Sequence, residues 1–339
     1  MALALLIGAA GGYAFWWLHL PLPWMLGALV ATLLAALARI PMRAPEAIRP
    51  PVVAVIGVLL GSGFTPSLIS QAGEWVLSLL ALGAYLAVAA AIAVPFYRRV
   101  AGFDPVTAYF AGMPGGLAEM MMLGRAMGGD DRKIILAHAA RIVVTVAAIA
   151  IWFRLIEGRT VGANPGGTPL LAMAPLDIVL LAGAGIVGAF LGVRLRLPAP
   201  TLLGPMILSG LFHVTGLTVS APPGGLVIAA QITLGTVMGC RFIGVAAGDV
   251  GRALMLSTGI TLLMLGLALV FALMLHGLVG QSAAQVLLAF APGGLTEMGV
   301  VALAIGADVA YVALHHVVRI VVVIAAAPIV ARWLRPRGP

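Results

Sequence analysis

A seven-residue motif occurs twice in the chain, and this repetition limits the folds that the sequence can adopt. The residues from Pro114 to Met120 read PGGLAEM, and those from Pro292 to Met298 read PGGLTEM, 178 positions later. The match extends to ionisable residues, with Asp130, His138 and Arg141 answering to Asp308, His316 and Arg319. A repeat of this length exceeds solenoid periods and has the size of a transporter half. We therefore interpret the chain as an internal duplication.

The composition places the chain in a membrane. Hydrophobic residues make up 62% and charged residues 9% of its 339 residues, a balance that no soluble domain of this size could keep in solution. The 43 glycines favour helices that pack closely, and the pairs Gly57/Gly61 and Gly235/Gly239 are candidates for such contacts. The net charge of +8 is scattered rather than clustered, so we expect no nucleic acid partner.

Apolar runs of membrane-spanning length divide the chain into two repeats. The first repeat, residues 1–156, has predicted spans near 2–18, 24–40, 51–66, 74–97 and 132–156, with an interrupted segment at 104–127. A glycine-rich linker occupies 157–175. The second repeat, residues 176–339, has predicted spans near 177–194, 201–217, 224–243, 252–277 and 308–332, with an interrupted segment at 283–305. The predicted fold is an all-α integral membrane protein.

Basic loops indicate how the two repeats are oriented, because short cytoplasmic loops collect Lys and Arg. In the first repeat these loops contain Arg43 and Arg98, after the second and fourth spans. In the second repeat they contain Arg196 and Arg252, after the first and third spans. This opposite bias predicts two inverted repeats with about five transmembrane helices each, with both termini in the cytoplasm. An odd number of crossings requires each interrupted segment to be re-entrant; full crossing would make the repeats parallel.

The Pro-Gly-Gly sequence predicts a break in each interrupted segment, because proline removes a backbone donor and glycine has low helix propensity. Such breaks expose the N-terminus of a half-helix, whose N–H groups and dipole attract anions. The predicted binding residues here are Gly115, Gly116, Glu119, Gly293, Gly294 and Glu297. Each glutamate either satisfies free backbone N–H groups or binds a proton or cation. A simple helix kink is the alternative interpretation of a single copy.

Ionisable residues on the helix that follows each break are the other candidates, because an uncompensated charge inside a span is costly. They are Asp130, His138 and Arg141, and in the second repeat Asp308, His316 and Arg319. Each arginine either forms a buried pair with a glutamate or aspartate, or anchors the carboxylate of a solute through two donors. Each histidine either carries protons or is a structural, hydrogen-bonded residue. No metal-binding spacing is present.

Further paired motifs resemble a known family. Pro23-Trp-Met-Leu-Gly27, its partner Pro200-Thr-Leu-Leu-Gly204, both Pro-Gly-Gly-Leu-x-Glu-Met motifs and the His-x-x-Arg pairs resemble the duplicated AbrB-type membrane protein family over nearly the whole chain. This family differs from the small soluble DNA-binding regulator of the same name. The resemblance implies a multi-pass protein of the bacterial inner membrane. Family labels name an ammonia monooxygenase or a membrane regulator, but the chain contains neither a metal-ligand set nor a soluble effector domain.

These features favour a secondary transporter of a small organic solute, with an anion preferred, coupled to H⁺ or Na⁺ by alternating access. The alternatives are a non-transporting membrane regulator or sensor of partner proteins and, third, a metal-dependent membrane oxidase. We expect no enzymatic activity, catalytic residue, metal site or cofactor. The expected partners are the solute, the coupling ion and the lipid bilayer, and self-association into a homo-oligomer stays open.

Overall fold

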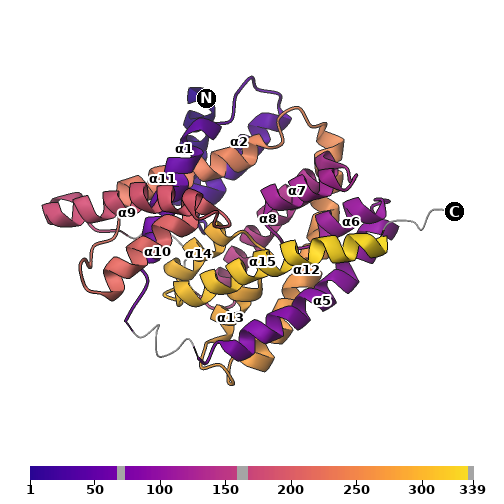
Figure 1. The fold of residues 1–339 in the computed structure, drawn as a ribbon. Coiled ribbons are helices and arrows are strands. Elements are labelled where there is room, and N and C mark those ends of the chain that lie inside the picture. Colours follow the sequence, from indigo (N-terminus) through magenta and orange to yellow (C-terminus); the bar gives the residue numbers. More distant parts are fainter. Residues whose placement is uncertain (67–72, 159–166, 335–339) are drawn as a thin grey trace. The chain divides into compact units, whose positions relative to one another are not determined.

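The computed structural model describes residues 1–66, 73–158 and 167–334, and these residues form helices without any β-strand (Figure 1). The predicted all-α class is confirmed. Five helices within this part of the chain are long and apolar enough to cross a membrane: α5 (Val76–Arg99), α8 (Asp131–Leu155), α9 (Pro175–Arg194), α12 (Ala247–Leu275) and α15 (Val309–Leu334). The chain is therefore a multi-pass membrane protein.

Shorter helices coincide with other predicted spans. They are α1 (Ala2–Trp17), α2 (Pro23–Leu37), α3 (Arg49–Gly61), α10 (Pro200–Val214) and α11 (Gly224–Cys240). These helices have 13–17 residues and are about 20–26 Å long, less than the thickness of a bilayer core. Part of the predicted linker, 159–166, and the C-terminal residues 335–339 lie outside the described residues; α9 begins at Pro175.

The duplication recurs in the bounds of the helices. The half-helices α6 (Pro105–Gly112) and α7 (Leu117–Ala126) have equivalents of the same lengths 178 positions later, α13 (Ala283–Phe290) and α14 (Leu295–Ala304). The residues before α2 and α10 also share a rare conformation: Leu22 and Ala199 have φ angles of 47° and 46°. Left-handed backbone is uncommon for residues other than glycine, so this shared geometry marks equivalent positions.

One compact unit contains residues 1–72, 149–246 and 296–310. Within it, α1 packs on α2 and α9 packs on α10, while α2 also contacts α11 and α10 also contacts α3 (Figure 1). Glycines permit these close approaches: a methyl group at Gly57 would overlap the carbonyl of Leu202, and one at Gly235 would overlap the carbonyl of Met25. The predicted packing role of these glycines is confirmed, and each connects a helix of one repeat to a helix of the other.

The second compact unit contains residues 73–148, 247–295 and 311–339. It holds α5, α6, α7 and most of α8 from the first repeat, together with α12, α13 and most of α15 from the second. Helix α5 packs on α6 and α12 packs on α13, and α5 also contacts α12. Tyr85 joins these elements, because its ring meets Phe271 and Phe290 edge-on. Each compact unit therefore combines helices from both repeats.

Candidate functional site: two broken helical segments and their arginine braces

Both Pro-Gly-Gly sequences interrupt a helix, as predicted. The chain leaves helical geometry from Met113 to Gly116, between α6 and α7, and from Ala291 to Gly294, between α13 and α14. Met113 and Gly116 have extended backbone, with ψ angles of 134° at both positions. Each break leaves two half-helix ends facing one short loop, one with free carbonyls and one with free N–H groups.

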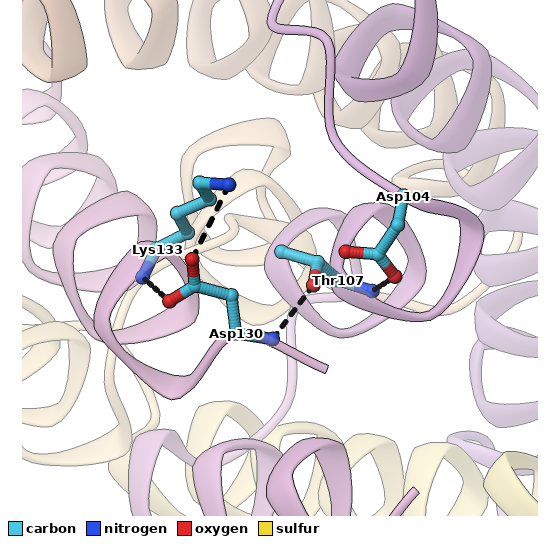
Figure 2. Close-up of polar contacts among 4 residues, drawn as sticks. All are labelled: Asp104, Thr107, Asp130 and Lys133. Atoms are coloured by element: carbon cyan, nitrogen blue, oxygen red, sulfur yellow. Dashed lines mark hydrogen bonds and ion pairs between the residues drawn. The ribbon is translucent and has the colours of Figure 1, made fainter. Parts of the chain in front are cut away.

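The first broken segment is a helical hairpin, because its two ends are hydrogen-bonded to each other (Figure 2). Asp104 caps α6 by accepting a hydrogen bond from the Thr107 N–H at 2.9 Å. The hydroxyl oxygen of Thr107 accepts a hydrogen bond from the Asp130 N–H at 2.8 Å, after the end of α7. Gly124 of α7 also lies against the ring of Phe110 on α6. The start of α6 and the start of α8 therefore lie together, and the Pro-Gly-Gly loop forms the hairpin tip.

Equivalent capping residues occur in the second repeat. Ser282, which corresponds to Asp104, accepts a hydrogen bond from the Gln285 N–H at 3.2 Å and caps α13. Asp308, which corresponds to Asp130, accepts a hydrogen bond from the Ala310 N–H at 2.9 Å at the start of α15. These side-chain oxygens satisfy N–H groups that the first turn of a helix leaves free. Both aspartates predicted as site residues thus lie at helix starts.

Asp130 is also ion-paired at this position. Its carboxylate lies 3.2 Å from the Lys133 ammonium and accepts a hydrogen bond from the Lys133 N–H (Figure 2). Burial acts to raise the pKa of the Asp130 carboxyl, but the hydrogen bonds and charge of Lys133 outweigh it, so this pKa is lowered. Asp130 precedes Arg141 by 11 residues, about 16 Å along the axis of a helix. The structure therefore places Asp130 at the closed end of the hairpin, where it meets Thr107, rather than beside Arg141.

Arg141 lies on α8 and reaches the C-terminal end of α6. Its side chain, in a residue that is 2% exposed, donates hydrogen bonds to the carbonyls of Ala111 (3.2 Å), Gly112 (3.1 Å) and Met113 (3.1 Å). The last carbonyls of a helix have no partner within it, and the helix dipole makes this end negative. Arg141 therefore satisfies the end of α6 by hydrogen bonding and by charge.

The second repeat contains the same arrangement. Arg319 on α15, also 2% exposed, donates hydrogen bonds to the carbonyls of Ala291 and Gly293 at the end of α13. His316 contacts Arg319 through Nδ1 at 3.0 Å, and its Nε2 lies 3.0 Å from the carbonyl of Leu288. The arginine thus supports the Pro-Gly-Gly loop itself as well as the end of the half-helix.

The partners of His138 determine where its proton lies. Nε2 is 2.8 Å from the carbonyl oxygen of Phe110, and Nδ1 is 2.8 Å from a guanidinium nitrogen of Arg141. A carbonyl can only accept and a guanidinium can only donate, so Nε2 carries the proton and Nδ1 accepts. The same logic applies to His316.

The hydrogen bonds leave little of Arg141 available to a solute. Four of the five N–H donors of a guanidinium can be assigned to the three carbonyls and His138, and Nε has no hydrogen-bond partner. Within the described part of the chain, neither Arg141 nor Arg319 forms an ion pair with a carboxylate. The two cations lie within electrostatic range of each other and of Tyr85. Each arginine is thus a brace for main-chain carbonyls, an arrangement that neither sequence-based alternative included.

The two motif glutamates differ in their surroundings. Glu119 is partly exposed and its carboxylate lies over Gly116, at the N-terminus of α7. Glu297 is 5% exposed in the first turn of α14, and within its compact unit it is in electrostatic range of Arg49 and Arg241. Both carboxylates therefore lie at the positive end of a half-helix, as the spacing predicts, but only the second is buried.

His315 is a buried polar residue that the sequence pattern did not single out. Its Nδ1 lies 2.8 Å from the carbonyl of Tyr311, and its Nε2 lies 2.9 Å from the hydroxyl of Ser78 on α5. The Ser78 hydroxyl also lies 2.8 Å from the carbonyl of Trp75. The adjacent histidines in the sequence were a signal, because the first repeat has Ala137 at the equivalent position. The described residues contain no group of three or more His, Cys, Asp or Glu that could hold a metal ion.

Comparisons with known proteins cover most of the chain. A family model described as "Transition state regulatory protein AbrB" matches residues 24–335. A Bacillus subtilis (strain 168) protein named "Uncharacterized protein YhjN" is 26% identical over 349 residues, which cover 95% of this chain and 90% of the relative. An Escherichia coli (strain K12) protein named "Putative regulator AbrB" is 24% identical over 325 residues, which cover 95% of this chain and 92% of the relative. The similarity therefore extends over both repeats.

Proposed function

The chain belongs to the AbrB family, and from this premise we propose that it is a secondary transporter of a small organic anion in the bacterial inner membrane. Transport is coupled to H⁺ or Na⁺ and proceeds by alternating access, without enzymatic chemistry. The observation that carries the proposal is the pair of broken segments. Each has a half-helix N-terminus at a Pro-Gly-Gly loop and an arginine that donates hydrogen bonds to the carbonyls at the end of the preceding half-helix. Discontinuous helices of this kind form the solute and ion sites of other carriers.

The closed end of the first hairpin supports an inverted topology. A hydrogen bond joins Asp130 to Thr107, so both ends of this segment lie at one membrane surface, because a hydrocarbon core is about 30 Å thick. The duplicated motif extends this proposal to the second repeat, where Ser282 and Asp308 each cap the start of their own helix. Each repeat then crosses the membrane five times. An odd number of crossings inverts the second repeat relative to the first and puts both termini on one side, which the basic loops assign to the cytoplasm.

The occupied arginine donors point to the half-helix N-termini as the anion site. The Gly115 N–H donates to the carbonyl of Met113, so the proposal assigns the anion to the main-chain N–H groups near Gly116, Gly293 and Gly294, where the helix dipole is positive. The guanidinium groups hold the carbonyl ends away from the solute and add long-range positive charge. In this proposal Glu119 and Glu297 exchange the coupling ion, while His138 and His316 orient the arginines.

Flux through purified protein in liposomes tests this assignment. A panel of small organic anions is measured with an imposed H⁺ or Na⁺ gradient, for the natural chain and for Glu119→Gln, Glu297→Gln and Glu74→Gln. Glu74 is an exposed carboxylate outside the motif and serves as the matched control. We expect the two motif variants to lose gradient-driven uptake while the control retains it. Full coupled flux in both folded motif variants would remove the glutamates from the mechanism.

A regulator of partner proteins is the second candidate, because the family description and the name of the Escherichia coli relative both specify regulation. The liposome experiment separates the two functions, since only a transporter moves solute when the chain is the sole protein present. Absence of flux for every solute in the panel, under both gradients, would favour the regulator.

A further inference from the structure

A cavity lies at the end of α5, away from the Pro-Gly-Gly loops. It has a volume of about 340 Å³ and is lined by Val94, Pro95, Arg98, Arg99, Phe103 and Pro105. Four of these residues are apolar, and the two arginines occupy the last turn of α5, a helix long and apolar enough to cross a membrane. The cavity therefore combines an apolar wall with positive charge where a membrane helix ends.

Several contacts hold the aromatic wall in place. The Phe103 N–H donates a hydrogen bond to the carbonyl of Tyr97 at 3.0 Å, so the loop folds back on α5. The Phe103 ring stacks on Tyr97 with a centroid distance of 5.4 Å, and the Lys133 ammonium lies 5.6 Å from its centroid. This wall is thus built by packing within one compact unit.

The charge at the cavity is uncompensated. Arg98 and Arg99 are exposed, and within the described residues neither forms an ion pair with a carboxylate. The nearest acidic group in sequence, Asp104, directs its carboxylate at the Thr107 N–H (Figure 2). Lys133 is already paired with Asp130. The cavity can therefore accept an anion without displacing an existing ion pair.

We propose that this cavity binds the headgroup of an anionic phospholipid. The two guanidinium groups bind phosphate oxygens, because their planar donors match phosphate geometry. Val94, Pro95 and Phe103 contact the glycerol and the first acyl carbons. Basic pockets beside membrane helices on the cytoplasmic side attract anionic lipids in this way. The proposal needs only a membrane protein, and it is independent of transport.

Lipid-dependent thermal stability of the full-length chain tests the site. The purified protein in detergent is titrated with phosphatidylglycerol, phosphatidylcholine or inorganic phosphate, and the midpoint of unfolding is recorded. Only phosphatidylglycerol should raise the midpoint. The double variant Arg98→Gln/Arg99→Gln should bind this lipid about 30-fold more weakly, because each basic group near anionic lipid strengthens binding by roughly five- to six-fold and two are removed. The matched control is Arg194→Gln/Arg196→Gln, which removes an exposed arginine pair at the C-terminal end of α9 and should respond as the natural chain does.

The other outcomes contradict the proposal. An unchanged lipid response in the folded double variant would place the lipid elsewhere. An equal response to phosphatidylcholine would mean that the headgroup charge is not recognised. A response to inorganic phosphate at the same concentration would assign the cavity to free phosphate instead of lipid. If the double variant has a lower midpoint without lipid, mass spectrometry measures the phosphatidylglycerol bound per chain instead. Equal binding by the double variant and the natural chain would then contradict the proposal.

Discussion

Arg141 and Arg319 place buried positive charge against main-chain carbonyls. A guanidinium suits this position because it has five donors in a fixed plane and stays charged when buried. Three carbonyls at the end of α6 accept hydrogen bonds from Arg141, and Nδ1 of His138 accepts another of its N–H donors. The histidine also donates to the carbonyl of Phe110. One Arg-His pair therefore orders the carbonyl end of the half-helix.

Replacing Arg141 with Ala should destabilise the protein by at least about 3 kcal/mol, because three buried carbonyls each lose a partner at roughly 1 kcal/mol or more. The stability of Arg141→Lys should lie between those of the natural chain and Arg141→Ala, because one ammonium cannot reach the same set of acceptors. Thermal unfolding of the purified chain measures the effect. Arg125→Ala is the control, because the Arg125 side chain is 79% exposed and its ion pair is long, at 3.9 Å. An unchanged midpoint in Arg141→Ala would contradict the brace.

Asp130 should make the stability of the hairpin depend on pH. The pKa of its carboxyl in the folded chain is below the ordinary value of 3.8, so ionised Asp130 stabilises the fold. This contribution is fully present above pH 3.8 and is lost as the pH falls through the lowered folded pKa. The difference in unfolding midpoint between the natural chain and Asp130→Asn should therefore shrink below pH 3.8. A difference that stays constant from pH 7 to pH 3 would show that the charge does not contribute.

At the scale of elements, the hairpin of α6 and α7 depends on contacts between its start and its finish. Asp104 caps α6, the Thr107 hydroxyl oxygen accepts a hydrogen bond from the Asp130 N–H, and Asp130 caps the start of α8 (Figure 2). These bonds join the start of α6 to the start of α8, just after the end of α7. The ends of the hairpin are thus held by specific hydrogen bonds, while Arg141 holds the region near its tip.

Thr107→Val should loosen the closed end of this hairpin while preserving side-chain shape. The Asp130 N–H loses its acceptor, so its hydrogen exchange should accelerate about tenfold, the change expected for one hydrogen bond. Exchange measured by mass spectrometry on peptides that cover 127–131 tests this. In the control, Thr233→Val, the lost hydroxyl binds only the carbonyl of Ala229 in its own helix, so exchange at 127–131 should not change. Equal protection in all three proteins would exclude a role for Thr107 in closing the hairpin.

At the scale of the whole molecule, each compact unit is assembled from both repeats. Helices α2 and α11 pack together in one unit, as do α3 and α10, and α5 contacts α12 in the other. Neither repeat therefore contains all the partners that its glycine-lined helices require. We expect the two repeats to fold together rather than as separate domains.

Single-cysteine labelling tests the proposed inverted layout. In a Cys240→Ser background, cysteines at positions 43 and 196 should be protected from a membrane-impermeant reagent added to intact cells. A cysteine at position 157, the first residue of the predicted linker, should be labelled, because the inverted layout places this linker outside the cytoplasm. Labelling of all three after the cells are opened is the control for accessibility. Strong external labelling at 43 or 196 would overturn the inverted topology.

The sequence by itself determined the class, the duplication and the breaks. Composition alone requires a membrane, the motif offset of 178 predicts the repeat, and Pro-Gly-Gly predicts where helices end. These properties depend on local chemistry, so they can be read without coordinates. The predicted spans accordingly coincide with the observed helices to within a few residues at most ends.

Only the tertiary structure decided what the polar residues contact. Arg141 and Met113 are 28 residues apart in sequence, and no local pattern specifies that a guanidinium will bind main-chain carbonyls rather than the carboxylate of Glu119. The bond between Asp130 and Thr107, the contact of His315 with Ser78 and the burial of Glu297 likewise depend on how distant helices meet. Sequence restricts which groups carry charge, but the partner of each charge depends on packing between elements that are far apart in the chain.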